Sequence, residues 1–119
     1  MLNRYKKNSE KIAMGLLSFM PEEKDIKKLQ HTIKEYETNP DWHLYLWKEE
    51  DVIGAIGLRL SGDKATIQHI SVNPSHRNSG VGKKMVHEIK KLYDNKYEVI
   101  AEESIEQYYK HCIQEDELG

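Results

Sequence analysis

The segment from residue 64 to residue 103 constrains the fold more than any other part of the chain. It begins with a predicted strand, "KATIQHISV", and it ends with a second, short one, "YEVIAEE". Between them a helical pattern runs from Ser79 to about Tyr93, with apolar side chains on one face: Val81, Met85, Ile89 and Leu92. One helix that connects two strands forms a crossover, which places those strands parallel in one sheet.

Residues 41–72 follow a period of two and predict an antiparallel arrangement. "WHLYLWKEE" alternates along a strand, and the β-rich runs "DVIGAIGLRL" and "KATIQHISV" follow it. The stretches "EEDV" and "LSGDKA" between them are typical of hairpin turns. We therefore expect a three-stranded meander, which together with the crossover predicts an α+β domain with a mixed sheet.

Three further helices are expected around this sheet. The first runs from Asn8–Ser9 to about Met20, the second from about Pro21 to Tyr36, and the last begins at Ser104 in "SIEQYYKHCIQ". Helical spacing predicts the packing faces of the first two helices, which are formed by Ile12, Ala13, Leu16, Phe19 and Met20, and by Ile26, Leu29, Ile33 and Tyr36.

The composition narrows the class of protein. A chain of 119 residues with 38% hydrophobic residues fits a single domain over residues 1–119. The formal net charge of -2 disfavours binding to nucleic acid or to anionic membranes, and no apolar run is long enough to span a bilayer. Cys112 is the only cysteine, and the six histidines show no metal-ligand spacing. We expect a cytoplasmic protein without a metal.

The junction between the strand "HISV" and the next helix has the features of an anion site. The helix begins near Ser79, so its free backbone N–H groups form the positive end of a helix dipole. Gly80 and Gly82 allow a ligand to approach this backbone closely.

Three cations beside these glycines strengthen that interpretation. Lys83 and Lys84 lie where positive charge opposes the helix dipole, and Arg77 precedes them. A bound anion would compensate for this cluster. The alternative is a solvated basic turn with glycine as loop filler; the cations and the strand–loop–helix context favour the anion site.

Two nucleotide-binding patterns fail at specific positions of this loop. The Walker A pattern requires Gly where Arg77 stands and Ser or Thr where Lys84 stands, and the dinucleotide pattern requires Gly where Met85 stands. The pattern that fits is Arg-x-x-Gly-x-Gly, from Arg77 to Gly82, which follows "ISVNPSHR" and precedes a helix. This motif in its context resembles the acyl-CoA-binding motif of the GNAT N-acetyltransferase superfamily.

The order of elements over nearly the whole chain also resembles that superfamily. It implies the GNAT acyl-CoA N-acyltransferase fold, with α/β/α layers, a meander and two splayed parallel strands. Within the superfamily, "RYKK…KIAMGLLSFMP" and "HISVNPSHR" resemble RibT-type acetyltransferases of riboflavin operons. The chain ends at Gly119, before the last two strands common in the family. A homodimer could supply the edge that this short C-terminus leaves open.

The resemblance implies acetyl-CoA as the cofactor and assigns residues to it. The pantetheine arm would pair with the strand at Ile70, Ser71 and Val72, in the manner of an added β-strand. Arg77 and Lys84 would assist with phosphate charge. The pyrophosphate would lie on the backbone of the motif loop, which comprises Asn78, Ser79, Gly80, Val81, Gly82 and Lys83.

Catalytic candidates follow from the same resemblance. Family members often use a Tyr of the last helix as general acid, and Tyr109 aligns best, with Tyr108 as the neighbouring alternative. Candidates for the base are His69, Glu102 and Glu103. Each also has an ordinary structural interpretation: His69 as a packing histidine, the glutamates as an acidic helix start, and Tyr109 as a core aromatic.

The resulting functional hypothesis is an acetyl-CoA-dependent N-acetyltransferase, in which a bound amine attacks the thioester directly. Glu102 replaces the Asn of the family pattern, and the C-terminus is short. These departures keep open the alternative of a catalytically weak or inactive CoA-binding module that regulates or accompanies other enzymes. A generic phosphate-binding domain is a third alternative. The acceptor is left open between a small amine, a flavin-pathway intermediate and a protein N-terminus or lysine.

Overall fold

The protein is built on one five-stranded sheet, and the computed structural model describes the backbone of residues 1–118 and the side chains of residues 1–113. In spatial order, the strands are β1 (Leu2–Arg4), β2 (Trp42–Lys48), β3 (Val52–Ser61), β4 (Lys64–Val72) and β5 (Glu98–Ala101). Strands β2, β3 and β4 form an antiparallel meander, and β5 pairs with β4 in parallel. The predicted meander and crossover are therefore confirmed. Strand β1 was not predicted, since three residues are too few to show a period.

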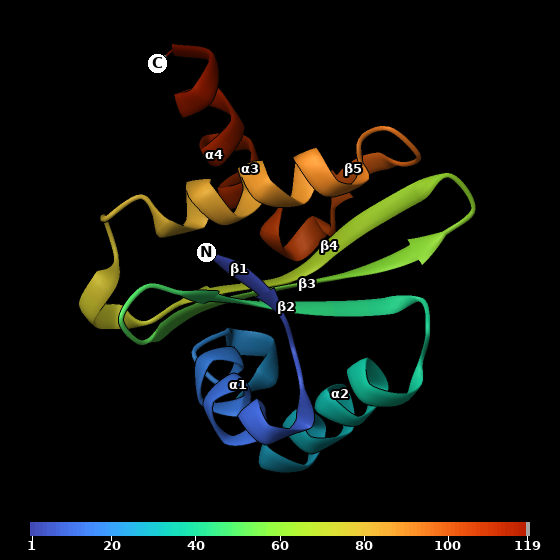
Figure 1. Cartoon of the computed structure of the whole chain (residues 1–119), viewed down its shortest axis with the longest axis vertical. Helices are drawn as coiled ribbons and strands as arrows, with labels where there is room; N and C mark the ends of the chain where they lie inside the picture. Colours follow the sequence, from blue (N-terminus) through green and yellow to red (C-terminus); the bar gives the residue numbers. More distant parts are fainter. Residues whose placement is uncertain (119) are drawn as a thin grey trace.

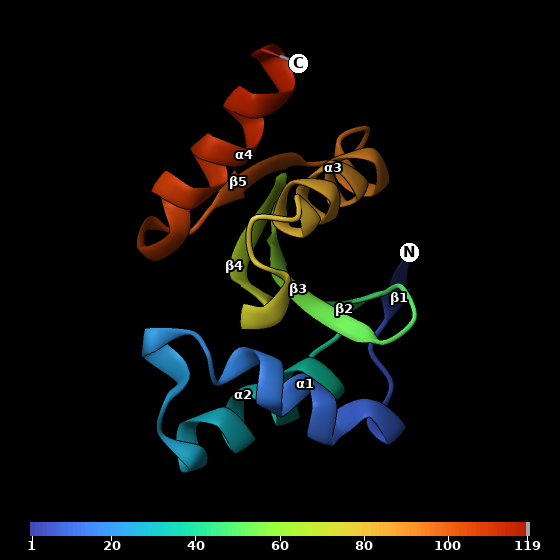
Figure 2. The same cartoon turned by 90° about the vertical axis from the view of Figure 1, so that its left-hand side faces the viewer.

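Helices cover both faces of this sheet (Figures 1 and 2). On one face lie α1 (Glu10–Leu17) and α2 (Ile26–Thr38), and on the other lie α3 (Val81–Tyr93) and α4 (Glu106–Leu118). Short 3₁₀ turns at 7–9, 21–23, 74–76 and 103–105 precede the four helices or join them to the strands. The layered α/β/α arrangement is thus the one expected. No helix among the described residues is long and apolar enough to cross a bilayer.

The first two helices are shorter than the sequence pattern predicted. Helix α1 ends at Leu17 rather than Met20, and α2 begins at Ile26 rather than Pro21. The intervening Pro21–Glu23 segment forms a separate 3₁₀ turn, in which the proline has no N–H to donate. Asp25 then caps α2 by accepting a hydrogen bond from the backbone N–H of Lys27 at 3.0 Å.

Four residues that the predictions placed on buried helix faces are instead exposed. Ile12, Phe19, Ile26 and Leu92 are 49%, 42%, 63% and 55% exposed. In α1 the buried face consists of Ala13, Leu16 and Leu17, so it is rotated by about one residue from the predicted stripe. Helical spacing identifies an apolar stripe, but the packing of the helix against the sheet decides which residues at the edges of that stripe are buried.

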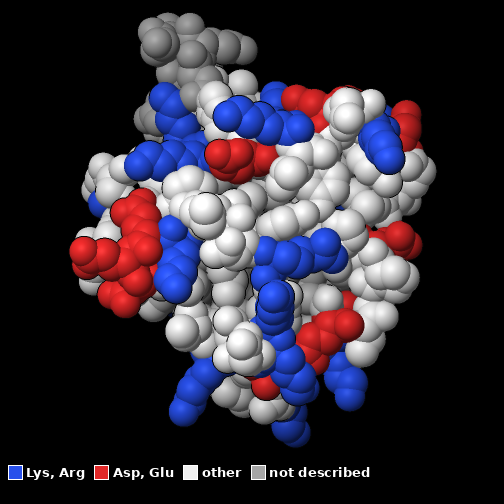
Figure 3. Space-filling model, viewed as in Figure 1, with Lys and Arg blue, Asp and Glu red and all other residues white. Residues whose placement is uncertain are grey.

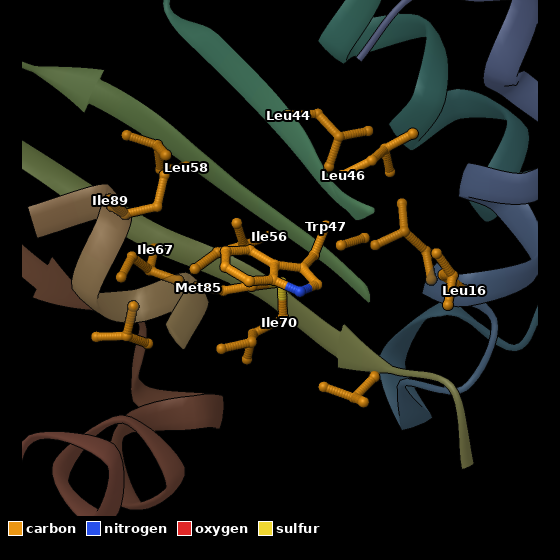
Figure 4. Close-up of a cluster of buried hydrophobic side chains, with 14 of the residues drawn as sticks. Leu16, Leu44, Leu46, Trp47, Ile56, Leu58, Ile67, Ile70, Met85 and Ile89 are labelled. Carbon is orange, nitrogen blue, oxygen red and sulfur yellow. The ribbon is translucent and has the colours of Figure 1, made fainter. Parts of the chain in front are cut away.

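The core fills the space between the sheet and the helices on both sides (Figure 4). On the α3 face, Met85 and Ile89 lie against Ile56 and Leu58 of β3, and all four are fully buried. Figure 3 shows Lys and Arg side chains in patches beside Asp and Glu, with uncharged surface between these patches. The large apolar core makes β3 and β4 a rigid base for the site described next.

Candidate active site

Strand β4 contains a β-bulge that shapes the site. Leu58 of β3 pairs with Ile67, and the neighbouring Gly57 pairs with His69, so Gln68 is an extra residue without a partner in β3. As a result, Gln68 and His69 direct their side chains to the same face of the sheet. Both are hydrogen-bonded to the hydroxyl of Tyr36 on α2, at 2.9 Å and 2.5 Å.

The two parallel strands separate at the same point. The last backbone contacts of β5 with β4 are the Ile67–Ala101 pair and the hydrogen bond from the N–H of Glu102 to the Ile67 carbonyl at 2.8 Å. Beyond Ile67, strand β4 has a free edge on this side. The splay expected between the parallel strands is therefore present.

The free edge carries peptide groups that can pair with an extended ligand. The N–H of Asn73 bonds to the Ile53 carbonyl of β3, so by alternation the peptide groups of Ile70 and Val72 point away from β3. The side chain of the intervening Ser71 points toward α1, and its hydroxyl donates a hydrogen bond to the Leu16 carbonyl. Of the predicted pantetheine-binding residues, Ile70 and Val72 thus present their backbone to the splayed side.

The free edge leads into the glycine-containing loop. Asn78 and Gly80 adopt positive φ, 68° and 82°, and α3 begins directly afterwards at Val81. Gly80 tolerates this conformation because it has no Cβ. The first turn of α3 has no acidic residue, so its N-terminal N–H groups, which have no partners within the helix, meet no carboxylate from their own turn.

The splay, the loop and α4 together enclose a cleft of about 780 Å³. Most of the predicted cofactor residues line it: Ile70, Ser71, Val72, Arg77, Asn78, Gly80, Val81, Gly82 and Lys83. The remaining two, Ser79 and Lys84, do not. The hydroxyl of Ser79 donates to the carbonyl of His76, and Lys84 is exposed on α3.

The structure places the two neighbouring tyrosines of α4 differently. Tyr108 lines the cleft and is 43% exposed, and its hydroxyl lies against Gly82 of α3: a Cβ at Gly82 would be 1.9 Å from it. Tyr109 is only 8% exposed, lies outside the cleft lining and donates to the Val99 carbonyl at 3.2 Å. Burial raises the pKa of Tyr109. Tyr108 therefore has the position that a group acting on a ligand in the cleft requires.

A second cavity of about 310 Å³ adjoins the cleft on the α2 side of the sheet. Met20, Glu22 and Ser104 line both spaces, so the two are neighbours. His69 and Glu102, two of the predicted base candidates, lie in the wall of this second cavity. Its other lining residues include Glu23, Lys28, His31, Thr32, Trp42 and Gln68. The exposed Glu103 lines neither space.

Glu23 and His69 form a buried pair in that wall. Their side chains are 4% and 9% exposed, and His69 Nε2 lies 2.9 Å from Glu23 Oε1. The hydroxyl of Thr32 donates to both oxygens of Glu23. Burial of the Glu23 carboxyl raises its pKa, but the contacts with His69, Thr32 and Lys28 outweigh this and hold the pKa below its ordinary value. Glu23 is therefore a carboxylate at neutral pH.

The same network continues to Glu102. Arg59 of β3 donates to the Gln68 side-chain oxygen at 2.8 Å and to Glu102 at 2.7 Å. Gln68 in turn donates to Tyr36. Arg59 thus connects the bulge of β4 to the end of β5, where the strands separate. Among the side chains of residues 1–113, no three His, Cys, Asp or Glu groups come together in a metal-binding arrangement.

Sequence reasoning identified the cleft residues but missed much of this network. Glu23 lies in the stretch "PEEKD", whose pattern indicates only a helix start, and Arg59 and Gln68 lie within runs that indicate only strands. Their partners come from distant parts of the chain, so no local pattern connects them. The one available signal was the adjacent polar pair Gln68–His69, which interrupts the alternation of β4.

The fold and the cleft define an acyltransferase-type protein, and comparison with known proteins gives the family. The sequence model of the acetyltransferase (GNAT) family matches residues 10–111. The chain therefore belongs to the GNAT acetyltransferase family and is an N-acetyltransferase by class. It is 55% identical over 114 residues to an uncharacterised N-acetyltransferase encoded in the lysA 3′ region of Bacillus methanolicus, and the match covers 94% of each chain.

Solved structures share the fold at low sequence identity. An aminoglycoside N-acetyltransferase in complex with CoA has a TM-score of 0.76 and 16% identity, covering 98% of this chain and 84% of the other. A GNAT acetyltransferase of Elizabethkingia anophelis with acetyl-CoA bound has a TM-score of 0.67 and 21% identity, covering 85% of this chain and 63% of the other. These likenesses confirm the predicted GNAT fold.

Proposed function

We propose that the large cleft binds acetyl-CoA and that the protein transfers the acetyl group to a primary amine. The observation that carries this proposal is the continuity of the free β4 edge at Ile70 and Val72 with the N-terminus of α3. An extended amide-containing arm fits the former and a pyrophosphate fits the latter. Both ends lie in the wall of one cleft of about 780 Å³. Family neighbours solved with CoA and with acetyl-CoA support the same ligand.

In this proposal, backbone peptide groups and cationic side chains of the cleft both bind acetyl-CoA. Peptide groups of Ile70 and Val72 would hold the pantetheine arm, and N–H groups of Val81 to Lys83 would bind phosphate oxygens. Arg77 and Lys83 line the same end of the cleft and add positive charge. Acetyl-CoA supplies an acetyl group already activated as a thioester.

Tyr108 is our candidate for the general acid. Its hydroxyl lies in the cleft beside the start of α3, whereas Tyr109 is buried outside the cleft lining. A hydroxyl in this position can give a proton to the departing sulfur. The N–H groups on the free edge of β4 can donate to an oxygen that gains negative charge.

The first experiment separates this function from its alternatives. Calorimetry with acetyl-CoA should show binding, and absence of binding at millimolar ligand would overturn the proposal. Release of free CoA thiol is then measured over a panel of primary amines. If CoA binds but no amine accelerates thiol release, the alternative of a CoA-binding module without turnover is favoured. The departure of Glu102 from the family pattern, and its engagement by Arg59, are the observations behind that alternative.

Three narrower features stay proposals. The resemblance of "RYKK…KIAMGLLSFMP" and "HISVNPSHR" supports a relationship to RibT-type acetyltransferases, with a flavin-pathway amine as acceptor. Location in the cytoplasm is proposed because the chain has one cysteine, Cys112, which cannot form an internal disulfide. A homodimer is proposed from the open sheet edges, and sedimentation of the purified protein tests it.

A further inference from the structure

The hydrogen bonds of the buried network all run in one direction. Arg59 can only donate, and it donates to the side-chain oxygen of Gln68, which leaves the Gln68 amide group to donate to Tyr36. At the other end, Glu23 is a carboxylate and can only accept. His69 must therefore present Nε2–H to Glu23 across their 2.9 Å contact.

This direction of the hydrogen bonds favours the Nε2–H tautomer of His69. In a neutral imidazole with Nε2–H, the Nδ1 atom has a lone pair and accepts from the Tyr36 hydroxyl. A second proton on Nδ1 would leave the buried hydroxyl of Tyr36 without an acceptor, which is costly. Both nitrogens of His69 are thus occupied within the protein. The histidine has no lone pair left to take a proton from a substrate.

Glu23, by contrast, keeps capacity on the cavity side. A carboxylate offers about four lone-pair positions. One hydroxyl shared between the two oxygens, from Thr32, and one contact from His69 at Oε1 are its hydrogen bonds within the network. Glu23 lines the second cavity, where Met20 and Trp42 provide apolar surface.

The second cavity also has the size for a small amine and lies next to the cleft. Its volume of about 310 Å³ lies at the low end for ligand pockets, equivalent to about ten water molecules. It meets the cleft at Met20, Glu22 and Ser104, next to the start of the free β4 edge. An amine held here can reach a group held on that edge.

We propose that the second cavity is the acceptor site, where the Glu23 carboxylate binds the ammonium group of a small primary amine with an aliphatic or aromatic body. His69 is a positioning residue that holds Glu23, and not the base. This inference rests on the proposed acetyl transfer. The bound ammonium group first loses one proton to water through the cavity, which gives its nitrogen a lone pair. The nitrogen then bonds to the acetyl carbon, the carbon–sulfur bond breaks, and the sulfur takes a proton from Tyr108. The second proton leaves the nitrogen as the amide forms and restores the hydroxyl of Tyr108.

The test compares Glu23→Gln with Glu50→Gln, which removes the same charge from the exposed turn between β2 and β3. The probes are butylamine and 2-phenylethylamine, and a lysine-containing peptide represents a protein acceptor. Glu23→Gln should raise the KM for the small amines about 10–100-fold, because it removes a charge-assisted hydrogen bond. Acetyl-CoA affinity should not change, and Glu50→Gln should match the wild type. Equal KM values for both variants, or acetylation of the peptide alone, would overturn the proposal.

His69→Gln separates positioning from base catalysis. The glutamine amide can still donate to Glu23, so we expect kcat within about 10-fold of wild type, whereas removal of a general base typically lowers kcat by about 10²–10⁴-fold. A loss of that larger size, with acetyl-CoA affinity retained, contradicts the positioning role.

A second readout works without turnover. ¹⁵N-histidine NMR spectra at neutral pH, assigned with His69→Gln, should show His69 as the neutral Nε2–H tautomer, and added butylamine should shift its Nε2 resonance. An imidazolium or Nδ1–H spectrum overturns the assigned tautomer. If acetyl-CoA binds and no amine drives thiol release, transfer fails, but an amine-dependent shift of His69 still supports the cavity as an amine site. Absence of both signals overturns the inference.

Discussion

Replacement of Gly82 by alanine should move the Tyr108 hydroxyl without removing it, so it tests whether the position of this hydroxyl matters for turnover. The added Cβ would lie 1.9 Å from the hydroxyl oxygen and 2.9 Å from Cζ. Since Cβ atoms essentially never approach other heavy atoms closer than 3.0 Å, the hydroxyl must move by at least about 1.1 Å. Tyr108 is 43% exposed, so its side chain can rotate away without disturbing the core.

The expected consequences differ for folding and for turnover. Alanine in a helix gains up to about 1 kcal/mol over glycine, which offsets the cost of the moved side chain, so the free energy of unfolding should change by no more than about 1 kcal/mol. A displacement of about 1 Å at a reacting group can lower the rate about 10²-fold. We therefore expect kcat to fall by about that factor, as in Tyr108→Phe, with acetyl-CoA still bound.

The assay is amine-dependent thiol release, with calorimetry for acetyl-CoA and urea denaturation for stability. Gly15→Ala is the matched control, because a Cβ at Gly15 meets nothing within 4 Å. Wild-type kcat in Gly82→Ala, together with a loss in Tyr108→Phe, would refute the positional argument. Wild-type kcat in both variants would remove Tyr108 from the mechanism.

Three further outcomes follow from the same contacts. Gly57→Ala would place a Cβ 2.1 Å from the buried hydroxyl of Tyr36, and because Tyr36 cannot rotate out of the core, urea denaturation should show a loss of about 1–3 kcal/mol, against none for Gly15→Ala. Arg77→Ala should weaken acetyl-CoA binding about 2–5-fold and reduce its dependence on salt in calorimetry, because Arg77 is an exposed cation in the cleft; unchanged affinity at low salt contradicts this. The pKa of Glu23 is lowered in the folded state from 4.5, so its stabilising effect is complete above that value and lost as the pH falls below it. Glu23→Gln should accordingly flatten the acid side of the stability–pH curve, and an unchanged slope would contradict the assigned contacts.

The parts of the fold that the sequence predicted are those with a local and repeated signal. Strands β2 to β4 and helix α3 have local patterns, and the crossover permits only one relative direction for β4 and the short β5. Strand β1 has three residues and no period. Helical spacing predicts that Ile12 and Phe19 are buried, but both are exposed, and α1 buries Leu17 instead.

The candidate site divides in the same way. The cofactor loop is contiguous from Arg77 to Lys83, so glycine, charge and helix start can be read together. The Glu23–His69 network draws on a 3₁₀ turn, helix α2, strands β3 and β4 and the residue after β5, and it depends on the extra residue at Gln68. A bulge changes the register by one residue without altering composition, so the apolar run that contains it predicts only a strand.

That bulge also shows how one strand can face both of the proposed binding spaces. Before it, Ile67 faces α3, and after it Ile70 faces α3 again, while Gln68 and His69 both face α2. The peptide groups of Ile70 and Val72 are left on the free edge, between the two sides. The cleft and the second cavity share Met20, Glu22 and Ser104. If they hold the donor and the acceptor as proposed, the acetyl group passes at this shared border, next to the Glu23–His69 network.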